Sequence, residues 1–129
     1  MTTITPYITV TDAAEALRWY QDALAATVTV DPIVMPDGKV GHVEFAIGGA
    51  RVMMSDPSDA AGVAPPPGGG RNDVTLHVDV DDADQVIARA REAGAEVVRE
   101  PEDTPHGRIG TMIDPYGHRW MINSPLPPR

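Results

Sequence analysis

The chain has 129 residues, the usual size of one compact domain and too short for two conventional ones. Nineteen acidic residues against ten basic ones give a formal net charge of −9, which argues against a non-specific binder of the nucleic-acid backbone. The lack of cysteine excludes disulfides, thiolate metal sites and thiol nucleophiles, and it fits a reducing cytoplasm, where we expect the protein.

Residues 1–55 have the pattern of a strand, a helix and three further strands. Asp12 followed by Glu15 is typical of a helix capping box, and the apolar stripe after it predicts a helix that ends near Leu24. The Pro-Asp-Gly sequence at 36–38 predicts a turn. Alternating apolar and polar side chains or β-branched residues predict the strands at 5–10, 27–30, 42–47 and 51–55.

Residues 73–124 repeat this order. Asp82 begins a second capping box, and Gly94 is placed to end the helix. Between the two modules, residues 56–72 contain three consecutive prolines and three consecutive glycines, which we interpret as an exposed linker. The strands of the second module are predicted at 74–80, 96–99, 109–113 and 119–122, and residues 125–129 form a C-terminal tail.

The two modules are related in sequence. A shift of 70 residues places 8–13 on 78–83, and a shift of 69 residues places 38–41 on 107–110. A slip of one residue in the turn near Leu24 accounts for the change of shift. The chain is therefore a tandem repeat with the order βαβββ in each half.

This repeat resembles the vicinal oxygen chelate superfamily, which includes glyoxalases, bleomycin-resistance proteins and extradiol dioxygenases. The residues that carry the resemblance are 10–12 (VTD) leading into 17–20 (LRWY), the corner at 93–97 (AGAEV) and the turn at 114–117 (DPYG). The resemblance implies an α+β fold in which two βαβββ modules form curled mixed sheets around a shared cavity, and subunits that pair as homodimers. It leaves open whether modules pair within or between chains, and whether 56–72 acts as a lid.

Metal-dependent members of that superfamily carry His or Glu early in the first strand and in the last strand of each module. The corresponding residues here are Thr5, Met53, Thr75 and Met121. A threonine hydroxyl is a weak neutral ligand, and a thioether suits soft ions rather than zinc, nickel, manganese or iron. We therefore expect neither the family's metal nor another cofactor.

A group of polar side chains is expected on the cavity side of the strands. Alternation places Tyr7, His42, Glu44 and His77 there. Three interpretations are open: a displaced metal site of two histidines and one carboxylate, metal-free acid–base chemistry by the His42 and Glu44 pair, or a polar lining without chemistry. If the protein is an enzyme, the catalytic candidates are His42, Glu44 and His77.

Apolar and cationic residues complete the predicted ligand site. Met53 and Met121 are placed to line the cavity, whereas Trp120 is expected on the other side of its strand. Arg51 and Arg119 can anchor an anionic group or form surface ion pairs. The ligand-binding candidates are Tyr7, Thr9, His42, Glu44, Arg51, Met53, His77, Arg119 and Met121.

Two functions fit these residues. The first is a metal-free protein that binds an amphipathic small molecule, of the sequestration or resistance type, and the net charge of −9 favours a cationic guest. The second is a lyase or isomerase that uses a displaced metal or His/Glu acid–base chemistry. No apolar run approaches the roughly 20 residues that span a bilayer, so we expect neither a membrane nor a nucleic acid as partner.

Overall fold

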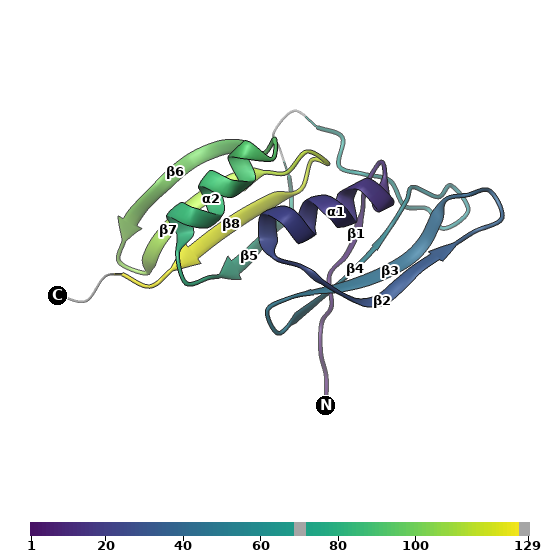
Figure 1. The fold of residues 1–129 in the computed structure, drawn as a ribbon, viewed down its shortest axis with the longest axis horizontal. Helices are drawn as coiled ribbons and strands as arrows, with labels where there is room; N and C mark the ends of the chain where they lie inside the picture. Colours follow the sequence, from purple (N-terminus) through teal and green to yellow (C-terminus); the bar gives the residue numbers. More distant parts are fainter. Residues whose placement is uncertain (69–71, 127–129) are drawn as a thin grey trace. The chain divides into compact units, whose positions relative to one another are not determined.

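The structure is a computed structural model that describes residues 1–68 and 72–126. The chain divides into unit 1, Met1–Pro65, and unit 2, Pro66–Arg129, and each unit contains one βαβββ module (Figure 1). The predicted α+β class and tandem order are thereby confirmed. The boundary falls inside the predicted linker, of which residues 69–71 lie outside the described residues, as do 127–129 of the predicted tail.

Unit 1 is a four-stranded sheet in the order β1-β4-β3-β2. β1 pairs in parallel with β4, and the other pairs are antiparallel. The predicted cap is present, because the Asp12 carboxylate accepts a hydrogen bond from the Glu15 backbone N–H at 3.1 Å. The elements are β1 (Tyr7–Thr9), α1 (Ala13–Leu24), β2 (Thr27–Val34), β3 (Val40–Ile47) and β4 (Ala50–Ser55).

The core of unit 1 lies between α1 and one face of its sheet. Val43, Phe45 and Met54 point to this side and are fully buried. The ring of Tyr20 on α1 stacks on Phe45, with ring centroids 5.3 Å apart. Because side chains alternate along a strand, the residues between these core positions face away from the helix.

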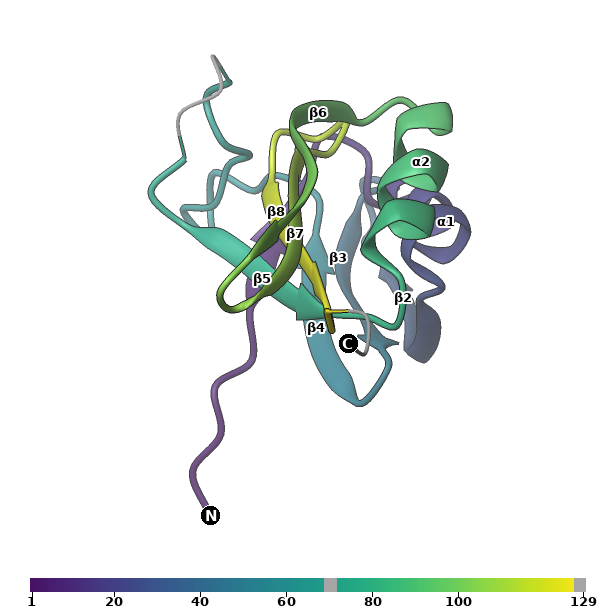
Figure 2. The same cartoon turned by 90° about the vertical axis from the view of Figure 1, so that its left-hand side faces the viewer.

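Unit 2 repeats the topology in the order β5-β8-β7-β6, and α2 covers one face of this sheet (Figure 2). The Asp82 carboxylate accepts from the Gln85 N–H, and Gly94, with a φ of 103°, follows the helix end as predicted. Trp120 is buried on the core side, as expected. The elements are β5 (Thr75–Asp79), α2 (Ala83–Glu92), β6 (Glu96–Thr104), β7 (Gly107–Ile113) and β8 (Arg119–Ser124).

Two edge strands are longer than predicted. β2 and β6 continue through Pro32 and Pro101, where the sequence indicated that the strands end. Both prolines lie at register shifts in their sheets, between Val30 and Ile33 and between Arg99 and Glu102. An edge strand tolerates proline at such an irregularity, because the missing N–H faces no ladder partner.

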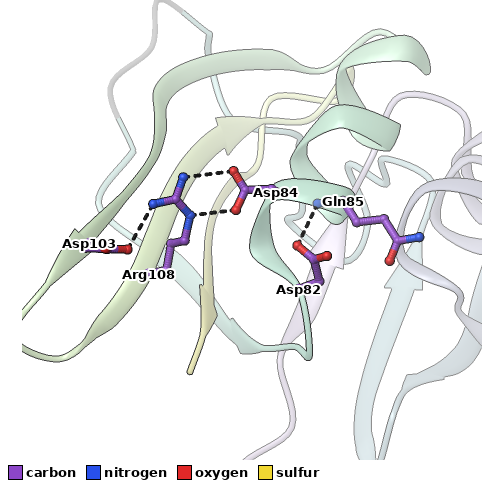
Figure 3. Close-up of polar contacts among 5 residues, drawn as sticks. All are labelled: Asp82, Asp84, Gln85, Asp103 and Arg108. Atoms are coloured by element: carbon purple, nitrogen blue, oxygen red, sulfur yellow. Dashed lines mark hydrogen bonds and ion pairs between the residues drawn. The ribbon is translucent and has the colours of Figure 1, made fainter. Parts of the chain in front are cut away.

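Arg108 on β7 ties the hairpin of β6 and β7 to the first turn of α2 (Figure 3). Its Nε lies 2.6 Å from Asp84 Oδ2, and its Nη1 lies 2.9 Å from Asp103 Oδ1. The hydrogen bond from Arg108 holds the pKa of the Asp84 carboxyl below its usual value. Neither helix in the described part of the chain is long and apolar enough to cross a membrane.

Candidate functional site

Four of the predicted site residues form one chain in unit 1, joined by two hydrogen bonds and one ion pair. Tyr7 Oη lies 2.8 Å from His42 Nδ1, and His42 Nε2 lies 2.8 Å from Glu44 Oε2. Arg51 Nη2 lies 3.2 Å from the other carboxylate oxygen of Glu44. The sequence predicted that Tyr7, His42 and Glu44 share a face, but not that they connect in this order or that Arg51 pairs with Glu44.

The sheet order explains why residues far apart in sequence meet here. His42 and Glu44 are two residues apart on β3 and therefore point to the same face. In the sheet register, Met53 on β4 lies opposite Glu44 on one side and Tyr7 on the other. The Tyr7 ring reaches across to His42, with ring centroids 5.4 Å apart.

The hydrogen-bond partners assign the protons in the neutral form of His42. A carboxylate only accepts, so the imidazole hydrogen lies on Nε2 and points to Glu44. Nδ1 then has a lone pair and accepts from the Tyr7 O–H. The other acceptor near this hydroxyl, the Gly41 carbonyl, is farther away at 3.3 Å. Both ring nitrogens of His42 are therefore engaged without a metal ion.

Exposure changes along this chain of residues. The side chain of Glu44 is 15% exposed and that of His42 is 26% exposed, whereas Tyr7 is 48% exposed. A carboxylate this far from water needs partners, and His42 and Arg51 supply them. The chain thus leads from a mostly buried charge to a phenol that solvent and ligands can reach.

Tyr7 also lines an open pocket of about 830 Å³ in unit 1. The other walls come from the turn between β2 and β3 with the first two residues of β3, and from Ser55 at the end of β4 with the segment that follows it up to Val63. Apolar side chains such as Met35 and Val63 form much of the lining, together with three aspartates and one lysine. His42 and Glu44 are not among the lining residues, so Tyr7 connects them to the pocket.

Sequence reasoning missed this pocket because it treated the segment after Ser55 as a linker. Asp56 fixes the segment: its two carboxylate oxygens accept from the backbone N–H groups of Ala13 and Val40, each at 2.7 Å. Backbone hydrogen bonds between Ser58 and Val63 close a small loop. The Asp-Pro pair at the end of a strand is a turn signal, and it was the available clue.

The remaining predicted site residues are distributed over both units. Thr9 on β1 is buried. In unit 2, His77 lies opposite Met121 in the sheet register, and the Arg119 guanidinium donates to the Thr75 hydroxyl at 2.7 Å. The structure therefore joins Tyr7, His42 and Glu44 in unit 1 and places His77 in unit 2, so a pocket that they all share remains a prediction.

The residues predicted to take the places of the family's metal ligands do not fit a divalent ion. Thr5, Met53, Thr75 and Met121 offer no imidazole or carboxylate. The Thr75 hydroxyl, moreover, already has the positive guanidinium of Arg119 as its neighbour. Among residues 1–68 and 72–126, no group of three or more His, Cys, Asp or Glu side chains is arranged to hold a metal.

Comparison with known proteins gives the family. The uncharacterized protein Mb0911c of Mycobacterium bovis (strain ATCC BAA-935 / AF2122/97) is 38% identical over 127 residues, which are 95% of this chain and 83% of that protein. The anthracycline biosynthesis protein DnrV of Streptomyces peucetius is 47% identical over 43 residues, 33% of this chain and 16% of that protein. The solved structure of TioX from Micromonospora sp. ML1 shares the fold, with a TM-score of 0.74 at 24% identity, covering 98% of this chain and 100% of TioX. Because the family pattern matches residues 2–122, which include both modules, the chain belongs to the Glyoxalase/Bleomycin resistance protein/Dioxygenase superfamily.

Proposed function

We propose that this protein binds a small organic molecule in the pocket of unit 1 and does so without the metal of its family. The observation that carries the proposal is the pocket of about 830 Å³, which is large enough for a drug-sized guest. Its walls combine apolar side chains with a few polar groups, as ligand pockets in proteins do. The threonines and methionines at the family's metal positions support binding without a metal ion.

The charges around the pocket favour a cationic amphiphile. Asp37, Asp56 and Asp59 line it, against Lys39 as the basic residue. Asp56 is committed to two backbone N–H groups and is half-buried. Asp37 and Asp59 are exposed, and Asp37 uses one carboxylate oxygen for the Lys39 N–H, so both can serve as partners for a cation. The net charge of −9 attracts a cationic guest to the whole protein. The short match to an anthracycline biosynthesis protein suggests a flat aromatic amine as the first probe.

Titration of doxorubicin, an anthracycline with a primary amine, tests the proposal through the fluorescence of the drug. Ala61 is exposed at the pocket wall, so Ala61→Trp narrows the pocket without crowding the core. We expect this variant to bind at least about tenfold more weakly, because the guest loses its apolar contacts. Ala88→Trp is the matched control, since Ala88 is exposed on α2 and does not line the pocket. Equal affinity of both variants, or no binding by the wild type, would contradict the proposal.

A further inference from the structure

We propose that Tyr7 is an activated phenol that exchanges a proton with a ligand in the pocket, with His42 as the proton acceptor behind it. In the forward step a weakly acidic O–H or C–H bond of the ligand breaks, its electron pair stays on the ligand, and an O–H bond forms at Tyr7. The original phenol proton moves to His42 Nδ1 along the 2.8 Å hydrogen bond. Glu44 holds the Nε2–H of the imidazolium, and the reverse step returns the proton.

The geometry meets the needs of such a relay. General-base catalysis requires the donor and acceptor within hydrogen-bond reach, and the transfer from Tyr7 to His42 spans 2.8 Å. The contact by which Glu44 holds the other ring nitrogen is also 2.8 Å long. The carboxylate that stabilises the imidazolium is 15% exposed, so water screens its charge only weakly. Arg51 binds the carboxylate oxygen that His42 does not use and fixes its orientation. Of the three relay residues, Tyr7 is the one that lines the pocket.

Unit 2 provides an internal comparison. In the sheet register, Thr111 lies opposite Met121 as Glu44 lies opposite Met53, so Thr111 takes the place of Glu44. The sequence shift of 69 residues would instead put Ile113 there, so the repeat alignment is off by two residues in this strand. Ile109 stands two residues before it, in the place of His42. The second module thus builds the same sheet with an isoleucine and a threonine where the first has the relay. The fold does not require the relay, which supports a role in function.

The relay also narrows the class of ligand, an inference that rests on the proposed function. A guest whose proton reaches Tyr7 carries an O–H or C–H bond about as acidic as a phenol, such as a phenol, an enol or a C–H between two carbonyls. The same guest places its cationic part toward Asp37 and Asp59, which line the pocket. A flat molecule with both a phenolic and an amino group meets both conditions.

Labelling with benzenesulfonyl fluoride tests the relay without a pocket ligand. The phenol oxygen attacks sulfur, the S–F bond breaks, fluoride leaves, and the phenol proton passes to His42. Tyr7 is the accessible tyrosine, because Tyr20 and Tyr116 are buried, and mass spectrometry of peptides measures its rate of modification. The test variants are His42→Gln, which keeps a hydrogen-bond acceptor but no base, and Glu44→Gln, which keeps the acceptor but no charge.

We expect His42→Gln to slow the labelling of Tyr7 by about 100-fold and Glu44→Gln by about tenfold. His106→Gln is the matched control, because His106 is exposed in the turn between β6 and β7, and its rate should equal that of the wild type. Equal labelling of wild type and His42→Gln would overturn the relay. If the wild type does not bind doxorubicin but His42→Gln still slows the labelling of Tyr7, the proposed function is overturned and the relay remains in place.

Discussion

At the scale of single residues, short acidic side chains hold the turns of both units. Asp114 is 3% exposed and accepts hydrogen bonds from the backbone N–H groups of Tyr116 and His118 and from the indole of Trp120 at 2.8 Å. The Asp-Pro-Tyr-Gly sequence predicted the turn at 114–117. It did not predict the bond to Trp120, because a turn signal carries no information about a side chain on the next strand.

Asp114→Ala is expected to lower the free energy of unfolding by about 3 kcal/mol, because two buried donors and one part-buried donor lose their acceptor. Urea denaturation followed by tryptophan fluorescence measures the loss, with Trp120 reporting on unit 2. Asp81→Ala is the control, since Asp81 is exposed beside the helix cap, and it should change the free energy by less than about 0.5 kcal/mol. A similar effect of both substitutions would contradict the role given to Asp114.

At the scale of elements, local sequence signals predicted both helices with their caps and the order of the strands. They failed where pairing with a neighbouring strand decides how far a strand extends. Pro32 and Pro101 lie inside edge strands for this reason. The site shows the same division. The two-residue spacing of His42 and Glu44 is visible in the sequence, whereas the contact with Tyr7 depends on the non-local order β1-β4-β3.

The ion pair of Arg108 with Asp84, which joins the β6–β7 hairpin to α2, makes the free energy of unfolding depend on pH. Arg108 lowers the pKa of Asp84 in the folded state, so the pair stabilises the fold above the ordinary pKa of 3.8 and is lost as the pH falls through the lowered value. Asp84 is 55% exposed, so solvent and salt reduce the effect.

Arg108→Gln therefore melts at a lower temperature than the wild type at pH 7, and the difference shrinks as the pH falls below 3.8 and through the lowered pKa of Asp84. Thermal melts at low salt across this range measure it. A difference in melting temperature that is the same at both pH values would show that Arg108 acts through packing rather than through the charge of Asp84.

At the scale of the whole molecule, we propose that the protein pairs as a homodimer through the free edge of β2. This strand ends one sheet, and Ile33 and Val34 on it are 52% and 64% exposed. The backbone N–H and C=O groups of an apolar edge strand can pair with a strand of another chain. In sedimentation equilibrium we expect the wild type to be a dimer and Ile33→Lys to be a monomer. Lys39→Ala is the control, because Lys39 lies outside β2, and this variant should remain a dimer. A monomeric wild type would contradict this proposal.

This member of the superfamily has a βαβββ module in each half, and we propose that it holds no metal, because Thr5, Met53, Thr75 and Met121 are predicted to stand where the family has its ligands. Elemental analysis of untagged protein, after incubation with nickel, zinc, manganese or iron(II) and dialysis, tests this proposal. We expect a metal content near zero for each ion. One tightly held ion per chain would contradict it and would make His42, Glu44 and His77 the first residues to substitute.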